Sequence, residues 1–517
     1  MGNNPYVASR MVSQAKWFAL AKVGVAIASL LTQFVLVRNL GVDDYAAYTI
    51  FVAGTAVLVF VTMFGMDRVV YRFMPPLREA VKWRELLLLM LGLISARLAL
   101  MLLLLLGLYF FSSLLLPKQI IEQSSSIPLQ YIAYGLSSAC NDSLLIFCNS
   151  LGLQKRQAML FMLAGCVRLA GLSSLVFIHD LGVVDVANVF AVTECVLSLA
   201  LLLVLAREFA HLRHNAPPPL PLSFGFSFRA LWRDSLGTQA AYMLGLPFRG
   251  ALLKLIVGAV ATPLVTASFG FFQTLSDRAY QFMPIFLAKG IVEPSLASDY
   301  SKYHDIERIR SAVSLLLRFN YVIIGLGIAS LIGCGEPLIN WVTHGRYGSE
   351  MLLAVLIVLQ LAGMSLGESL FLSLNPIGRI SHHNRLWLWF SLPFLGLLGL
   401  CAYLRSPLLL VLVSTMPYYI IYGWLRWVNK EPSLQQGLGI GLPVLLRLVA
   451  AVAGAALVAR LVLFIPGGNF VIVAALLGCV AAYLLALRFV GLFKRTELPA
   501  LARISPRFAR LLEPISS

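Results

Sequence analysis

Charged side chains inside apolar stretches are the residues of this sequence that could do chemistry. A charge that faces lipid costs roughly 2.5 kcal/mol or more, so such a side chain lines the protein interior or a water-filled cavity, or reaches back to the membrane surface. We prefer the surface explanation for Arg318, Arg460 and Arg488, which lie near the ends of their stretches or on outer helices. The others are candidates for binding an anionic substrate: Lys22, Arg97, Arg168, Arg278 and Arg447, with Arg249 and Lys254 at the predicted outer end of another stretch.

Acidic residues inside the apolar stretches are fewer, namely Asp142, Glu194, Asp277 and Glu368. A carboxylate in a low dielectric favours its protonated form and can exchange a proton near neutral pH, and it can also hold Na⁺. We therefore predict Asp142 and Glu368 as ion-coupling residues. Asp277 is included, although its neighbour Arg278 offers it a local partner.

The sequence contains no Walker A loop, no HExxH and no CxxC, which disfavours an ATPase or a metalloenzyme. The seven cysteines lie mostly in apolar stretches and are predicted to be small core residues. The pair His382-His383 in "RISHHNR" is predicted to lie in a solvated loop. We expect no catalytic residues, no metal and no cofactor.

The composition predicts an all-α polytopic membrane protein. Of the 517 residues, 59% are hydrophobic and 12% are charged, and the mean hydropathy is +0.85; a soluble domain is about one quarter charged. The net charge of +17 is spread over short loops between apolar stretches. No continuous basic face is predicted, so a nucleic-acid partner is not expected.

Apolar runs of roughly 20 residues, enough to cross a hydrocarbon core of about 30 Å, recur along the chain. They predict 14 transmembrane helices, at 17–37, 45–66, 86–113, 128–149, 158–178, 184–206, 234–256, 262–286, 314–334, 351–374, 386–404, 407–425, 441–464 and 469–490. With the N-terminus placed inside, few basic residues fall in the outside loops, namely Arg38, Lys118, Arg249, Lys254, Arg346 and Arg405. This asymmetry predicts that both termini are cytoplasmic.

A proline-rich segment divides the chain. Pro217, Pro218, Pro219 and Pro221 cannot belong to a continuing helix. We predict an N-terminal six-helix lobe at 1–206, a cytoplasmic linker at 207–233 and a C-terminal six-helix lobe at 234–426. Residues 427–517 would add helices thirteen and fourteen and a basic amphipathic tail that lies on the membrane surface.

Two similar stretches fall at matching places in the two predicted lobes. "DRVVYRFMP" at 67–75 is predicted to end the second span, and "DRAYQFMP" at 277–284 is predicted to end the eighth, with a proline closing each one. Two six-helix halves in the same orientation are the plan of several transporters that rock one half against the other around a central site.

Two longer segments carry a resemblance to a known family. "LTQFVLVRNLGVDDYAAYTIFVAGTAVLVFVTMFGMDRVVYRFMP" at 31–75 resembles the opening of the Wzx-type oligosaccharide flippases, which belong to the multidrug/oligosaccharidyl-lipid/polysaccharide exporter superfamily. "HGRYGSEMLLAVLIVLQLAGMSLGESLFLSLNPIGR" at 344–379 resembles the tenth span of the same family and its approach.

This resemblance implies two lobes that form a V-shaped bundle with a central cavity. It also implies transport of undecaprenyl-pyrophosphate-linked oligosaccharide repeat units across the bacterial inner membrane, for surface polysaccharide, lipopolysaccharide or exopolysaccharide assembly. Expected partners are the lipid-linked oligosaccharide, membrane lipids, and the polysaccharide polymerase and export machinery. Helices thirteen and fourteen would form a groove for the lipid tail, as in the related lipid II flippases, although their small residues equally suit close packing.

In the family's arrangement, spans one, two, seven and eight face the cavity. The resemblance therefore implies that Lys22, Arg68, Arg249 and Arg278 contact the phosphates or sugar acids of the substrate. Three alternatives stay open: a polysaccharide polymerase or ligase of the same pathway, a drug or metabolite antiporter of the same superfamily, and a scaffold of a polysaccharide-assembly complex. Short predicted outside loops disfavour the enzyme, and 14 predicted spans disfavour the antiporters, which normally have 12.

Overall fold

The structure is a computed structural model that describes residues 8–79, 82–115, 128–214, 239–240, 243–286, 304–375, 377, 379–428 and 442–491. Every regular element in these ranges is helical. The chain divides into two compact units, Met1–Phe271 and Phe272–Ser517. The predicted linker, at 207–233, lies mostly outside the described residues, and so does the predicted amphipathic tail.

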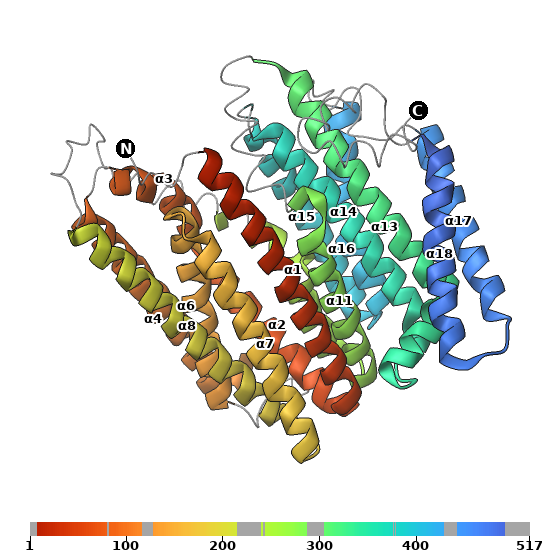
Figure 1. The fold of residues 1–517 in the computed structure, drawn as a ribbon, viewed down its shortest axis with the longest axis horizontal. Coiled ribbons are helices and arrows are strands. Elements are labelled where there is room, and N and C mark those ends of the chain that lie inside the picture. Colours follow the sequence, from red (N-terminus) through yellow and green to blue (C-terminus); the bar gives the residue numbers. More distant parts are fainter. Residues whose placement is uncertain are drawn as a thin grey trace. The chain divides into compact units, whose positions relative to one another are not determined.

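The first unit consists mainly of long helices that run side by side (Figure 1). They are α1 (Ala8–Asn39), α2 (Val42–Val61), α3 (Met66–Glu79), α4 (Trp83–Leu115), α6 (Pro128–Ser150), α7 (Gln154–Ile178) and α8 (Val183–His214), followed by the short helix η1 (Leu246–Phe248), α10 (Gly250–Val260) and the N-terminal part of α11 (Pro263–Phe282). Helix α6 packs against α4 and α8, α1 packs against α7, and α10 packs against α2. The division between the units therefore falls inside α11 rather than at the predicted linker.

The second unit begins with the C-terminal part of α11. It continues with α13 (Ile306–Thr343), η2 (Gly348–Glu350), α14 (Met351–Leu374), α15 (Ile380–Tyr403), α16 (Pro407–Gly423), the π-helical turn η3 (Trp424–Val428), α17 (Leu442–Leu463) and α18 (Gly468–Val490). Helix α14 packs between α13 and α16, while α17 and α18 pack against each other and against α13. The pair α17 and α18 (blue in Figure 1) thus extends the bundle along α13.

Among the described residues, 11 helices are long and apolar enough to cross a membrane. Helices α6 and α11 occupy predicted spans but are not among them, since each carries many polar side chains, and α10 is too short. The prediction of 14 spans is therefore supported for 11 of them. A polar helix can lie in a membrane protein where neighbouring helices shield it from lipid.

Helix α3 corrects the prediction for "DRVVYRFMP". Helix α2 ends at Val61, the chain turns through Phe64 (φ 43°) and Gly65 (φ 65°), and α3 then runs to Glu79, past Pro75. Its apolar positions recur at helical spacing and are buried in the core of α3, α4, α6 and α8, as for Val70, Met74 and Leu77. The stretch thus lies in a separate amphipathic helix and does not end the second span.

In the second copy, α11 ends at Phe282, the chain bends at Met283, and helical residues resume at Pro284. A proline cannot donate the backbone hydrogen bond that would continue the helix. The two similar stretches are therefore not equivalent helix ends.

Candidate functional site

The interior of the first unit contains an ion pair between α4 and α6. The guanidinium of Arg97 lies 2.7 Å from the carboxylate of Asp142, and it also donates hydrogen bonds to the Ser143 hydroxyl (2.9 Å) and to the Val59 carbonyl (2.8 Å). The Arg97 side chain is 2% exposed, whereas that of Asp142 is 37% exposed. The Val59 carbonyl is in the last turn of α2, where carbonyls lack a helical donor. Arg97 thus joins α2, α4 and α6, and Asp142, predicted to couple an ion, is its counter-ion.

A second ion pair, between α7 and α8, is contacted by Asn141, the residue of α6 that precedes Asp142. Asn141 donates to the carboxylate of Glu194 on α8 (2.5 Å) and accepts from the Ser198 hydroxyl (2.8 Å). Glu194 also pairs with Arg168 of α7, whose guanidinium lies 4.3 Å from the centre of the Phe190 ring. Consecutive residues of a helix point about 100° apart, so α6 meets one ion pair on each of two sides. We did not predict Glu194 as an ion-coupling residue, although its position inside an apolar stretch was the available signal.

The predicted seventh span is broken near its middle. Arg249 is extended (φ −97°, ψ 147°), Pro247 precedes it within η1, and α10 begins at Gly250. Helix α10 continues past Lys254 to Val260, so the helix ends later than the predicted span, which ends at residue 256. The exposed Arg249 guanidinium lies 4.8 Å from the centre of the Phe60 ring of α2.

Gln239 fixes the chain just before this break to the end of α2. Its amide nitrogen donates to the carbonyls of Phe60 (3.2 Å) and Val61 (3.4 Å), and its amide oxygen accepts from the backbone N–H of Gly65 (3.2 Å). The Gln239 side chain therefore hydrogen-bonds backbone groups in the last turn of α2 and in the turn that follows, where helical partners are missing. The polar Gln239 within an apolar stretch was a signal that sequence reasoning missed.

The other two substrate-binding candidates of the first unit lie elsewhere. Lys22 lies on α1 and is half-buried. Arg68 lies on the amphipathic α3, and its side chain is outside the described part of the chain.

The remaining predicted residues lie in the second unit, Asp277 and Arg278 on α11 and Glu368 on α14. Gln273 donates to the carboxylate of Asp277 one turn later (3.1 Å). Arg278 follows, with its Nε buried and without a hydrogen-bond partner among the described residues. The Tyr280 hydroxyl lies 3.4 Å from a carboxylate oxygen of Glu368 on α14 and donates to it. Asp277 and Glu368 therefore have separate partners.

His383 lies close to this second carboxylate. Sequence reasoning placed it in a solvated loop, which is wrong, because α15 already begins at Ile380 and His383 is only 8% exposed. Its Nε2 accepts a hydrogen bond from Trp387 one turn later (3.0 Å), and the ring lies within electrostatic range of Glu368. Helices α11 and α14 thus bring Tyr280 and Glu368 into contact, and α15 contributes the His383–Trp387 pair.

Comparisons of the sequence with known proteins show little. No protein-family model matches the chain. The chloroplastic NAD(P)H-quinone oxidoreductase chain 4 of Psilotum nudum is 27% identical over 152 residues, which are 28% of this chain and 29% of that protein. The match covers less than a third of each protein and does not show a family.

Comparisons of the structure are more informative. The lipid II flippase MurJ in an inward closed conformation is similar with a TM-score of 0.62 and 13% identity, over 91% of this chain and 97% of that chain. A multidrug resistance MATE family transporter of the MOP superfamily, inward-facing, has a TM-score of 0.56 and 13% identity, over 78% of this chain and 97% of its own. A MATE transporter of Vibrio cholerae has a TM-score of 0.51 and 16% identity, over 82% and 98%. The chain therefore has the all-helical, multi-pass membrane fold of the MOP-superfamily transporters.

Proposed function

We propose that the protein is a flippase that moves an undecaprenyl-pyrophosphate-linked oligosaccharide repeat unit across the bacterial inner membrane by alternating access. Its two lobes would surround a central cavity, both termini would be cytoplasmic, and the product would feed surface or exopolysaccharide assembly. The observation that carries this proposal is the extent of the structural match. The lipid II flippase matches 91% of this chain, whereas the two MATE transporters match 78% and 82%.

That difference favours a lipid-linked substrate over a small drug or metabolite. It amounts to roughly a tenth of the chain, about the length of two membrane-spanning helices. Helices α17 and α18 have 22 and 23 residues and pack along α13 as an addition to the bundle. An extra helix pair of this kind would give an acyl or prenyl chain a surface beside the transport path.

The broken seventh span supports a site for an anionic group. Discontinuous helices in transporters often place the positive end of a half-helix against an anionic group of the substrate. Arg249 is the N-cap residue of α10, so a basic residue stands at the positive end of this half-helix. We propose Arg249 as a phosphate contact, and Lys22, Arg68 and Arg278 as the further basic residues of the path.

The coupling ion would act through carboxylates. Binding of a proton or Na⁺ to Asp142 would have to displace its pair with Arg97. Glu368 has the neutral Tyr280 hydroxyl and the titratable His383 near it, which suits exchange of a cation better. We therefore favour Glu368 for coupling, followed by Asp277 and then Asp142.

An enzyme of the same pathway is the second candidate, and one structural detail disfavours it. Residues 335–350, one of the longest predicted outside loops, form the end of α13, a short turn and η2. This segment leaves little room for an acceptor site.

The decisive experiment locates the lipid-linked oligosaccharide after depletion of the protein. If the protein is a flippase, the intermediate accumulates on the cytoplasmic leaflet at unchanged chain length. Accumulation of single repeat units on the outer leaflet would instead indicate a polymerase. Normal delivery to the outer leaflet would refute the proposal.

A further inference from the structure

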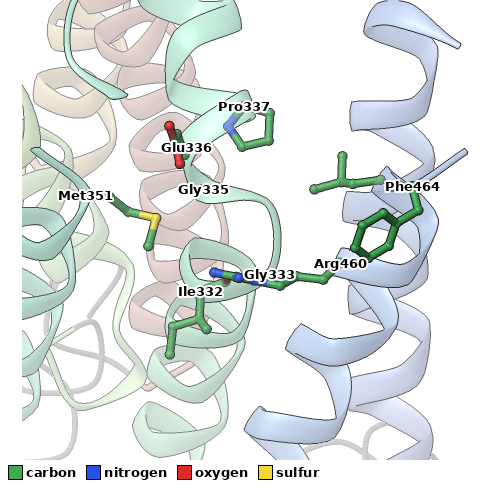
Figure 2. Close-up of a pocket in the computed structure, with 9 residues that line it drawn as sticks. Ile332, Gly333, Gly335, Glu336, Pro337, Met351, Arg460 and Phe464 are labelled. Atoms are coloured by element: carbon green, nitrogen blue, oxygen red, sulfur yellow. The ribbon is translucent and has the colours of Figure 1, made fainter. Parts of the chain in front are cut away.

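A pocket in the second unit lies where three helices meet. It has a volume of about 240 Å³ and is formed by the segment 332–337 of α13, by Met351 at the start of α14, and by Arg460, Leu463 and Phe464 at the end of α17. Figure 2 shows these side chains around a bend in α13. Because α14 begins and α17 ends here, the pocket lies at the level where membrane spans reach the bilayer surface.

The bend that opens the pocket is built into α13. Cys334 is non-helical (φ −136°, ψ 17°), and Pro337 three residues later cannot donate a backbone hydrogen bond. Gly333 brings α13 against α17, since a Cβ there would lie 2.7 Å from the Ala459 Cβ. A helix kinked by proline, with a glycine at the helix contact, holds a fixed shape.

Arg460 supplies a cation on one wall of the pocket. Its Nε donates to the Ile332 carbonyl at the bend (3.1 Å), so the side chain points toward α13 (Figure 2). The sequence suggests that the Arg460 side chain reaches to the membrane surface, whereas in the structure it has a defined hydrogen-bond partner on α13. No ion pair of Arg460 occurs within the described ranges. The guanidinium therefore retains its terminal N–H groups for an anion, and phosphate matches their forked geometry.

Glu336 supplies an anion on another wall. Its side chain is exposed and lies apart from Arg460 (Figure 2), and the two do not form an ion pair. Apolar side chains surround them, and Phe464 is 83% exposed. The pocket thus presents separate positive and negative charges beside an apolar surface.

We propose that this pocket binds the headgroup of a zwitterionic phospholipid of the phosphoethanolamine type. The phosphate would bind Arg460, the primary ammonium would bind Glu336, and the acyl chains would lie along Ile332 and Phe464. An ammonium with N–H groups is preferred to a quaternary one, because it can donate hydrogen bonds to the carboxylate. A purely anionic headgroup would be repelled by Glu336. The site is distinct from the proposed transport path.

The test measures lipid retention and does not depend on transport. The purified full chain is exchanged into mixed micelles with equal amounts of phosphatidylethanolamine, phosphatidylcholine and phosphatidylglycerol, and the bound lipids are counted by native mass spectrometry. We expect phosphatidylethanolamine to be retained about tenfold over the other two, the size expected for one charge-assisted hydrogen bond. Equal retention of phosphatidylcholine or phosphatidylglycerol would overturn the proposal.

Variants separate the two charges. Arg460→Ala should lower retention of all three lipids, whereas Glu336→Gln should keep the phosphate contact and abolish the preference for phosphatidylethanolamine over phosphatidylglycerol. Arg488→Ala, an exposed arginine on α18 outside the pocket, is the matched control and should behave as the wild type. Glu336 is exposed, so its substitution spares the core, and an unchanged lipid preference in this variant alone would refute the assignment.

Discussion

Arg97 and Asp142 form an ion pair of 2.7 Å inside the first unit, and the same guanidinium reaches the Val59 carbonyl of a third helix. Arg97 of α4 thereby holds Asp142 of α6 in place and also donates a hydrogen bond to a backbone carbonyl in the last turn of α2. The pair gives the aspartate of α6 a counter-ion inside the helix bundle. A structural role for Asp142 thus stands beside its predicted role in ion coupling.

Removal of one partner should therefore destabilise the protein. We expect Arg97→Ala to cost about 1–3 kcal/mol of stability, because it leaves Asp142 without its counter-ion and leaves the Val59 carbonyl with the Thr62 hydroxyl as its remaining donor. The lower end of that range is expected if water reaches the partly exposed carboxylate. The measurement is thermal unfolding of the purified protein in detergent.

Asp142→Asn distinguishes the structural role from ion coupling. The structural role predicts a lower melting temperature and less protein in the membrane, with transport per molecule retained. Loss of transport at an unchanged melting temperature would restore Asp142 as a coupling residue.

Arg249→Ala should lower export of the lipid-linked oligosaccharide at least about tenfold without lowering membrane abundance, because a phosphate loses a charge-assisted contact. Arg249→Lys should retain part of the activity, since lysine keeps the positive charge but cannot donate two parallel hydrogen bonds to the phosphate as a guanidinium does. Export is measured as the fraction of substrate that reaches the outer leaflet.

A matched control for Arg249 is available in the same unit. Arg84 is also exposed and lies 5.3 Å from the centre of the Trp83 ring, but it stands at the start of α4, away from any helix break. Arg84→Ala should leave export unchanged. Equal losses in the two variants would show that an exposed arginine on an aromatic ring, and not the break, matters.

Glu368→Gln should abolish ion-driven accumulation while substrate exchange at equilibrium continues, because an amide cannot take up a proton or neutralise Na⁺. Tyr280→Phe should weaken coupling less, since it removes only the hydroxyl that faces the carboxylate. The measurement is substrate uptake into proteoliposomes with and without an imposed proton or sodium gradient. Full gradient-driven uptake by Glu368→Gln would exclude this residue and direct attention to Asp277.

Gly333→Ala should destabilise the second unit by separating α17 from α13. The added Cβ would lie 2.7 Å from the Ala459 Cβ and 3.0 Å from the Ala456 carbonyl oxygen, which belongs to the backbone and cannot move alone. We expect a cost of about 1–3 kcal/mol, as for other overpacked sites. The melting temperature in detergent is the readout.

Gly454→Ala on α17 is the comparison for this site, since a Cβ there would have no atom within 4 Å. It should be neutral or slightly stabilising, because alanine favours a helix more than glycine does. Equal losses in the two variants would mean that the close helix contact contributes little.

Much of the fold could be predicted from the apolar runs. Helices α14, α16, α17 and α18 follow the predicted spans closely, because each run is long and its ends are marked by turn residues such as Pro407 and Gly467, whereas α13 extends beyond its predicted span at both ends. Averaging over about 19 residues cannot resolve a short amphipathic helix, however, so α3 was merged with the span before it. Pro247 was a sequence signal for the break at Arg249, but averaging over about 19 residues concealed this signal as well.

The candidate site was less predictable. The sequence identifies Arg97, Arg168, Asp142 and Glu194 as charges inside the membrane, and all four are paired with each other in the structure. Which acid meets which base depends on how each helix is rotated about its axis, and apolar runs on every side of a helix leave that rotation undetermined. His383 was misplaced for a related reason, since α15 starts earlier than its apolar run.

Gln239 gives the broken seventh span a mechanical property. Its three hydrogen bonds end on the last turn of α2 and on Gly65, so moving the chain before the break away from α2 would leave the Val61 carbonyl and the Gly65 N–H without this partner. Helix α10, after the break, also packs against α2. Both sides of the break are therefore held by the same helix, which favours a break of fixed geometry over a flexible joint.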